Sequence, residues 1–228
     1  MSKKKEICIL SIHYKPIYSS CSALIEDLAI SLKEHNFLVT IITPSSSIRN
    51  SCELTSEDGL DIVRIKTGNI RTKNYIYRFF LELTLPFITL LRLNKFIKKK
   101  KFDLIICYSP SIFWYYLLKK LKRNSKVYLI LRDIFPQWII DANLISKSSV
   151  IIKFLKFVER RLYNISDRIG VQSKKNIDYF TKNFPDLINK IETLHNWNTP
   201  KEYNNLDLTL KYSQQISKLK SKVVFVFG

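Results

Sequence analysis

The chain has 228 residues, of which 46% are hydrophobic and 13% aromatic, a globular composition that excludes a disordered chain. Lysine and arginine number 38 against 19 aspartates and glutamates, which gives a formal net charge of +19. Such an excess favours a polyanionic partner, either nucleic acid or an anionic membrane surface. Compositional drift is the alternative explanation for part of it, because the chain is rich in Lys, Ile and Asn and has only 4 Gly.

The cysteines and the N-terminus indicate a reduced, cytosolic setting. The cysteines are far apart, form no CxxC pair and are accompanied by only three scattered histidines, so we expect no metal site. The start, MSKKKEICILSI, lacks the long apolar region of a signal peptide. The longest apolar stretch, from Tyr75, is interrupted by charges and by Pro86, so it is too short for a membrane span of ~20 residues.

Short apolar runs alternate with stretches of helical spacing along the chain. The runs predicted to be strands are 6–12, 38–43, 60–66, 103–108, 126–131, 168–172 and 190–195. The stretches predicted to be helices are 22–35, 75–101, 111–123 and 148–165. This alternation predicts an α/β, Rossmann-like fold with a parallel sheet and helices on both faces.

The character of the chain changes after Pro200. Residues 1–199 are expected to form the main domain, and the polar segment 200–221 is expected to be a linker. Residues 222–228, ending in VVFVFG, are expected to be the first strand of a second domain that is missing from the sequence.

Polar residues follow the predicted strands, where an open α/β sheet binds its ligands. The candidate substrate-binding residues at these positions are His13, Ser19, Ser20, Ser109, Trp138, Ser173 and Asn196. Hydroxyls, amides and a few charges on one edge suit a hydroxyl-rich or phosphorylated ligand. The absence of GxGxxG and GxxxxGK[ST] motifs argues against nicotinamide oxidoreductases and P-loop enzymes.

The stretch LRDIFPQW places Arg132 and Asp133 directly after a predicted buried strand. A guanidinium can bind phosphate or sugar oxygens, and the neighbouring carboxylate can orient it or accept a hydroxyl proton. Phe135 and Trp138 would form an apolar lip. Three structural alternatives stay open: a plain ion pair here, a helix N-cap at Ser19 or Ser20, and a structural role for His13.

A series of motifs resembles the N-terminal half of a retaining family 4 glycosyltransferase of the GT-B fold. In order these are HYKP, LVTIITPSS, DGLDIVRIKT, KKFDLIICYSPSIF, LRDIFPQWIIDANLI, FLKFVERRLYNISDRIGVQS and KIETLHNWNTP. LRDIFPQW followed by the ERxLY run is the most specific of them. The nearest subgroup is the WbuB-like enzymes of O-antigen, capsule and colanic-acid assembly.

The resemblance implies sugar transfer from a nucleotide sugar to a polyprenyl-diphosphate-linked glycan, without a metal or another cofactor. It implies that Arg132, where many relatives have histidine, and Asp133 are catalytic, and that Asn196 lies on the hinge side of the cleft. Two departures matter. The glycine-rich first loop of the family reads IYSSCSA here, and the donor-binding half does not follow, so we expect the chain alone to be inactive.

Two basic, aromatic helices are expected to bind the inner face of the cytoplasmic membrane. The predicted membrane contacts are Lys98, Lys99, Lys100, Lys101, Phe113, Trp114, Lys119 and Lys120. The alternative is an ordinary core helix with a solvated basic end. Pro86 is expected to kink the longer helix.

Other function classes remain as alternatives. A non-catalytic module could use the same helices to bind a membrane or a protein. Nucleic-acid binding is permitted by the charge, but we expect none, because helix-turn-helix, RNP and zinc-finger signatures are absent.

Overall fold

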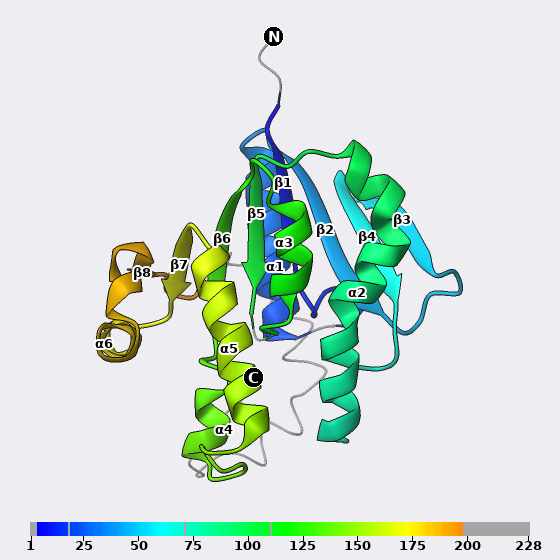
Figure 1. Ribbon diagram of the computed structural model, residues 1–228. Helices are drawn as coiled ribbons and strands as arrows, with labels where there is room; N and C mark the ends of the chain where they lie inside the picture. Colours follow the sequence, from blue (N-terminus) through cyan, green and yellow to red (C-terminus); the bar gives the residue numbers. More distant parts are fainter. Residues whose placement is uncertain (1–3, 18, 71, 110, 198–228) are drawn as a thin grey trace, which may run out of the picture. The chain divides into compact units, whose positions relative to one another are not determined.

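The computed structural model describes residues 4–17, 19–70, 72–109 and 111–197. Their strands form one sheet in the order β3-β4-β2-β1-β5-β6-β7-β8, and only the β3–β4 pair is antiparallel (Figure 1). All seven predicted strands are present, which confirms the α/β, Rossmann-like prediction. The strands are β1 (Glu6–Leu10), β2 (Leu38–Ser45), β3 (Cys52–Glu57), β4 (Leu60–Lys66), β5 (Leu104–Tyr108), β6 (Lys126–Leu131), β7 (Arg168–Val171) and β8 (Ile191–Thr193).

The strand that the sequence did not predict is β3. Its sequence, CELTSE, is polar, and its side chains alternate between half-buried and exposed along much of its length, as on an edge strand with one covered face. Asp58 and Gly59 join it to β4 with φ angles of 53° and 74°. Asp-Gly with positive φ at both positions is a strong signal for a tight hairpin, and this signal could have located β3.

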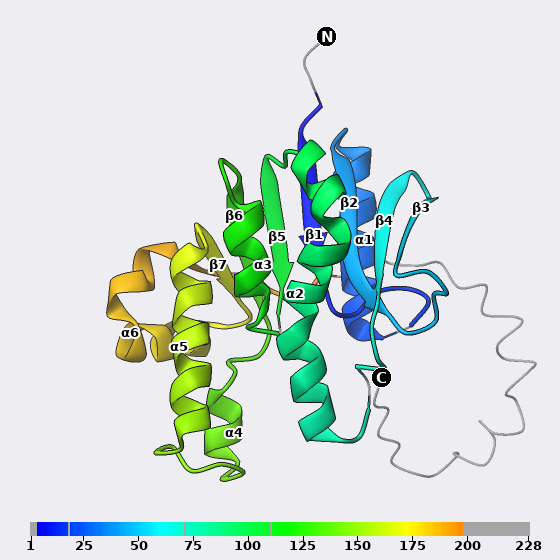
Figure 2. The same cartoon turned by 45° about the vertical axis from the view of Figure 1, so that its right-hand side comes forward.

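Helices cover both faces of the sheet, as predicted. They are α1 (Ser20–Glu34), α2 (Tyr75–Lys99), α3 (Trp114–Leu121), α4 (Gln137–Asp141), α5 (Val150–Ile165) and α6 (Lys174–Asn183), with a 3-10 turn at Pro185–Lys190. Helix α1 lies behind the sheet in Figure 1 and buries Ile25 and Ala29. Helices α2, α3 and α5 lie side by side in front of it, as the turned view in Figure 2 also shows. We call these three the helix layer.

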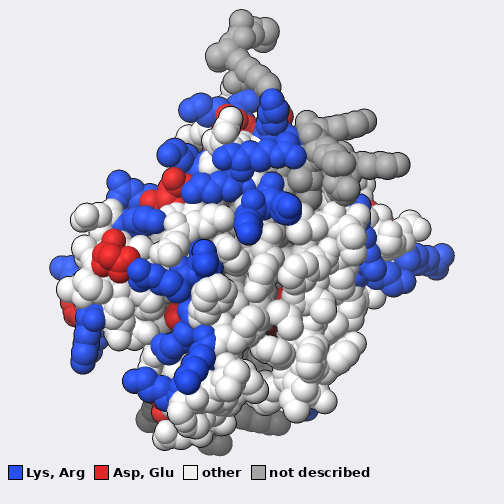
Figure 3. All heavy atoms as spheres, viewed as in Figure 1, with Lys and Arg blue, Asp and Glu red and all other residues white. Residues whose placement is uncertain are grey.

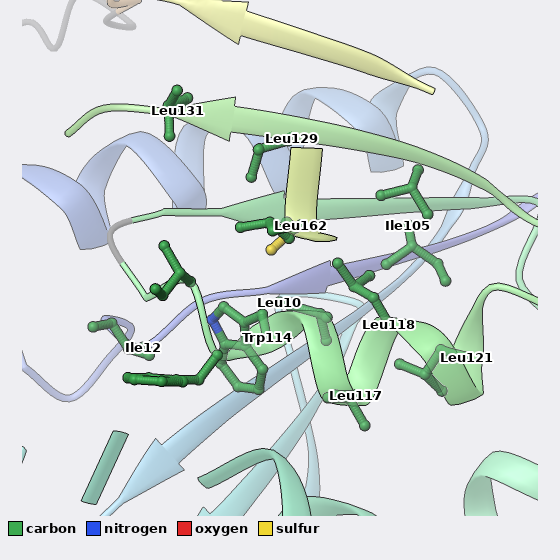
Figure 4. Packing of buried hydrophobic residues seen from close by; sticks show 14 of the residues in the cluster. Leu10, Ile12, Ile105, Trp114, Leu117, Leu118, Leu121, Leu129, Leu131 and Leu162 are labelled. Carbon is green, nitrogen blue, oxygen red and sulfur yellow. The ribbon is translucent and has the colours of Figure 1, made fainter. Parts of the chain in front are cut away.

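Helix α3 supplies the centre of the core beneath the helix layer. Its buried residues, Trp114, Leu117, Leu118 and Leu121, recur at the spacing of one helical stripe. Figure 4 shows Trp114 beside Leu10 of β1 and Leu118 pointing toward Ile105 of β5. Phe113 and Trp114 are only 2% and 1% exposed. This corrects the expectation that they contact a membrane, because the apolar stripe of α3 faces the sheet.

Helix α2 runs from Tyr75 to Lys99 with Pro86 inside it, so the proline does not end the helix. The side chains of Lys98 and Lys99 lie outside the described part of the structure. Lys100 is half-buried: its Nζ lies 2.9 Å from an Asp61 carboxylate oxygen and donates to the Thr40 hydroxyl. Lys100 therefore anchors the end of α2 to the sheet, which corrects its predicted role as a free membrane contact. Lys101 is exposed.

Two further expectations concern the membrane and the end of the chain. Among the residues that the structure describes, none of the helices is both long enough and apolar enough to cross a bilayer. The predicted linker 200–221 and the predicted strand 222–228 lie outside the described residues.

Candidate functional site

The strand order reverses at β1, whose neighbours are β2 on one side and β5 on the other. Crossovers leave β1 and β5 in opposite directions, so the connections after these strands diverge and open a crevice at their carboxyl ends. The residues following β1, β5 and β6 are therefore the ones to inspect for ligand binding.

The loop after β1 is held by its own side chains. The Ser11 hydroxyl donates to the carbonyl of His13 at 2.9 Å and accepts from the backbone N–H of His13. Ser19 is the N-cap of α1, where it and Ser22 form a reciprocal capping box. Of the two serines considered as a helix N-cap, Ser19 is therefore the one that caps α1. Ser20 is exposed on the first turn of the helix, and His13 is half-buried.

Arg132 lies at the centre of a cluster that four elements build. Its guanidinium donates from Nη1 to the carbonyl of Leu194 at 3.3 Å, and its Cζ lies 5.7 Å from the centre of the Tyr108 ring. Tyr108, the last residue of β5, is buried, and its hydroxyl contacts Cys21 in the first turn of α1. The ends of β5 and β6, the start of α1 and the segment after β8 thus meet around this arginine.

Electrostatics keep this cluster cationic. Burial raises the pKa of Tyr108 well above its usual value, the contact with Cys21 raises it further, and Arg132 opposes both effects. Tyr108 is therefore a neutral phenol at physiological pH, and the charge that the cluster offers is the guanidinium. A planar cation at a strand end is suited to phosphate or carboxylate oxygens.

The segment after β8 reaches Arg132 because β7 has a glycine. A Cβ built on Gly170 would lie 2.8 Å from the Cβ of Leu194 and 2.7 Å from the hydroxyl of Tyr128. The Leu194 N–H donates to the carbonyl of Val171 at 2.7 Å. The missing side chain thus lets Leu194 pack closely on the sheet, where its carbonyl meets the guanidinium.

The residues after Arg132 form a partly exposed lip. Asp133 is exposed, and the rings of Phe135 and Trp138 have their centres 6.3 Å apart. Trp138 is 47% exposed. Gln137 fixes the short helix α4, because its side chain accepts from Lys156 of α5 and donates to Asp141. The exposed carboxylate and indole remain accessible to a ligand.

The other predicted site residues are spread along the sheet edge. Ser109 is fully buried, and its Oγ has no hydrogen-bond partner among the described residues. Ser173 is the N-cap of α6 and accepts from the Asn176 N–H. Asn196 is exposed near the end of the described chain. The structure brings Arg132 together with Tyr108 and Cys21, which were not among the predicted site residues.

Two hollows open at the same edge, on the side of β1 away from Arg132. The larger, about 560 Å³, is lined by Lys15, Arg49 and Arg64 together with carboxylates and small residues. Arg64 is 8% exposed and is neutralised by Glu57, whose pKa its hydrogen bond holds below the usual value. The smaller lies between His13, Pro44 and Asn69. Neither hollow is lined by Arg132. The carboxylates that line the larger one, Glu53 and Glu57, come from β3, which the sequence did not predict.

Metal ligation has no support in the described part of the chain, which contains no cluster of three or more His, Cys, Asp or Glu side chains suited to a metal ion.

Comparison with known proteins decides the family. Residues 22–197 match the model of Glycosyltransferase Family 4. The chain belongs to this family. No curated protein matches the chain.

Solved structures show that this family 4 chain has the fold of the N-terminal half of GT-B glycosyltransferases. The catalytic domain of starch synthase IV from Arabidopsis thaliana, bound to ADP and acarbose, matches with a TM-score of 0.61 and 12% identity over 96% of this chain and 59% of that chain. Sucrose-phosphate synthase from Thermosynechococcus elongatus matches with a TM-score of 0.60 and 13% identity over 94% of this chain and 53% of that chain. A UGT transferase from Siraitia grosvenorii in complex with UDP matches with a TM-score of 0.52 and 10% identity over 94% of this chain and 56% of that chain. The chain thus spans little more than half of these neighbours.

Proposed function

We propose that the chain is the acceptor-side half of a retaining glycosyltransferase. In this proposal a sugar passes from a nucleotide sugar to a polyprenyl-diphosphate-linked glycan in surface-polysaccharide synthesis, as in the WbuB-like subgroup. The family match supports glycosyl transfer, and the neighbours solved with ADP or UDP support a nucleotide donor. No metal or other cofactor takes part, and the enzyme works on the inner face of the cytoplasmic membrane.

The observation that carries the proposal is the Arg132 cluster. A guanidinium held between the Tyr108 ring and the Leu194 carbonyl lies at the carboxyl end of β6, next to the strand-order switch point between β1 and β5 of a family 4 domain. Its fork binds diphosphate oxygens, and Asp133 beside it, exposed to solvent, orients the acceptor hydroxyl or accepts its proton. Catalysis then consists of positioning and of stabilising the charge of the departing diphosphate.

Acceptor binding tests this proposal with the chain itself. The chain is titrated with a polyprenyl-diphosphate-linked oligosaccharide in neutral detergent micelles, and binding is followed by calorimetry. We expect saturable binding that Arg132→Ala weakens about tenfold to a hundredfold, since a charge-assisted hydrogen bond contributes about 1.5–3 kcal/mol. Arg168→Ala is the matched control, because Arg168 is an exposed arginine at the amino end of β7 that also donates to one backbone carbonyl.

Sugar transfer is the second measurement. In a protein that joins this chain to a donor-binding domain, Arg132→Ala should abolish most transfer without lowering the melting temperature, and the product should keep the anomeric configuration of the donor. Wild-type transfer by Arg132→Ala, or an inverted product, would refute the proposal. So would rapid transfer by the isolated 228 residues. The alternative of a non-catalytic module is not favoured by the family match.

A further inference from the structure

Large apolar side chains are exposed at one end of the helix layer. The first turns of α2 and α5 extend beyond the carboxyl ends of the strands in Figures 1 and 2. Six apolar side chains there are each between 53% and 80% exposed. We call them the helix-tip surface: Tyr75, Ile76 and Phe80 of α2, Leu144 after α4, and Val150 and Ile151 of α5.

The fold does not account for this exposure. The inner side of α2 packs on the core through Leu85 and Leu93, which are 1% and 2% exposed. A surface helix normally turns polar residues outward, but α2 carries Ile76 and Phe80 on its outer side, one helical turn apart. A helix that is apolar on both sides needs a second apolar environment, and large apolar side chains exposed together at one end of a fold mark a protein or membrane contact.

Charges beside the helix-tip surface indicate which partner it contacts. Lys73, Lys147 and Lys153 are exposed next to it and make no ion pair within the described part of the chain. The exposed carboxylate Asp141 already accepts a hydrogen bond from Gln137. Figure 3 shows Lys and Arg along the α5 side and few acidic atoms over the lower part of the helix layer.

The overall charge separates two possible occupants. A second copy of the chain would bring another net charge of +19 against the first, and the resulting repulsion opposes self-association through this face. An anionic bilayer attracts the same charge. Exposed aromatic and aliphatic side chains with cations beside them are the composition of a surface that lies in the headgroup region.

We propose that the helix-tip surface inserts into the headgroup region of an anionic bilayer, with Lys73, Lys147 and Lys153 on the lipid phosphates. The inference rests on the membrane part of the proposed function and assigns it to residues other than those the sequence predicted. Because the tips lie at the carboxyl end of the sheet, insertion brings the Arg132 edge toward the headgroups. A diphosphate carried on a membrane lipid lies at that depth.

Vesicle co-sedimentation of the full chain tests the surface. The vesicles are phosphatidylcholine with or without phosphatidylglycerol, and they contain no acceptor. We expect binding to the anionic vesicles, weakened about tenfold or more by the combined substitutions Ile76→Ser, Phe80→Ser, Val150→Ser and Ile151→Ser. The matched control is Leu38→Ser with Leu54→Ser: these residues are 47% and 59% exposed, on β2 and β3. Neutralising each of the three lysines should weaken binding about fivefold at low salt.

Insertion has an independent readout in Trp138, which is 47% exposed near the tips. Brominated lipids should quench its fluorescence, and Trp138→Phe should remove that quenching. Melting curves confirm that the serine variants remain folded.

Three outcomes would overturn the inference. Vesicle binding unchanged in the serine variants would show attraction by charge alone. If the wild-type chain did not bind vesicles, the helix-tip surface would not be a membrane contact. A stable dimer that the same serine variants dissociate would assign the surface to a second copy. A chain that binds vesicles but not the polyprenyl acceptor would leave this surface standing and refute the proposed function, so the two failures are distinguishable.

Discussion

The inner and outer sides of the helix layer carry similar side chains in opposite surroundings. Trp114 on the inner side of α3 is 1% exposed, whereas Phe80 on the outer side of α2 is 56% exposed. Both helices place aromatic residues beside lysine and arginine, and both are expected from sequence to contact a membrane. Their positions relative to the sheet, rather than their composition, decide which aromatics are core and which are surface.

The largest effect that would test this contrast is the loss of the inner tryptophan. Trp114→Ala should lower the free energy of unfolding by about 3–5 kcal/mol, because it leaves a large cavity among Leu10, Leu117 and Leu118. Urea titration measures it. Trp114→Phe is the control: it keeps most of the ring and removes a buried indole N–H that has no partner among the described residues, so it should cost much less. Equal losses in both variants would contradict the packing argument.

A buried carboxyl on the inner side of α5 gives the next largest effect. Glu159 is 0% exposed, and burial raises its pKa from 4.5 to about 7 against the opposing hydrogen bond from Tyr163 and the charge of Lys156. The folded state therefore holds the proton more tightly than the unfolded state. The protonated Glu159 carboxyl therefore contributes its full stabilisation of the folded state below pH 4.5, and this contribution is lost as the pH rises toward 7.

At about 1.4 kcal/mol per pKa unit, this loss amounts to about 3 kcal/mol. Glu159→Gln keeps an acceptor for the Tyr163 hydroxyl and cannot ionise. Urea titrations from acid to neutral pH measure the free energy of unfolding of both proteins. As the pH rises, wild type should lose stability relative to Glu159→Gln. A difference that stays constant with pH would contradict the shifted pKa.

The outer side of α2 should tolerate polar substitution. Ile76→Ser combined with Phe80→Ser should change the free energy of unfolding by no more than about 1 kcal/mol, because these side chains are 72% and 56% exposed and fill no cavity. Thermal melts of this double variant and of Trp114→Ala, measured side by side, compare the two losses of stability directly. A loss as large as that of Trp114→Ala would place α2 in the core after all.

The smallest effect concerns Lys100, predicted from sequence as a membrane contact. Its ion pair with Asp61 is partly exposed, with side-chain exposures of 25% and 46%, so Lys100→Met should cost about 1 kcal/mol or less. It should leave vesicle binding unchanged, whereas Lys153→Gln should reduce it. Co-sedimentation of both variants distinguishes an anchoring lysine from a lipid-binding one.

The predictability of the fold depends on the burial of each element. Strands buried on both faces, such as β5 and β6, appear in the sequence as short apolar runs, and the structure has them within one residue of the predicted bounds. The polar strand β3 has no such signal apart from its Asp58-Gly59 turn.

The candidate site was predictable only in part. Arg132 could be singled out because it directly follows a buried strand. Its partners Tyr108 and Cys21 come from separate elements, and their convergence depends on strand order, which the sequence does not contain. For the same reason, nothing in the local sequence distinguishes the buried Phe113 from the exposed Phe80.

The two margins of the sheet have a consequence for how the protein behaves at high concentration. Unpaired strand margins recruit other chains into growing β aggregates when they are long, flat and apolar. Here one margin is the hydrophilic, antiparallel β3, and the other is β8, with three residues. Among the described residues neither margin offers a template for such growth, so aggregation of this part of the chain would start from its apolar helix surfaces rather than from its sheet.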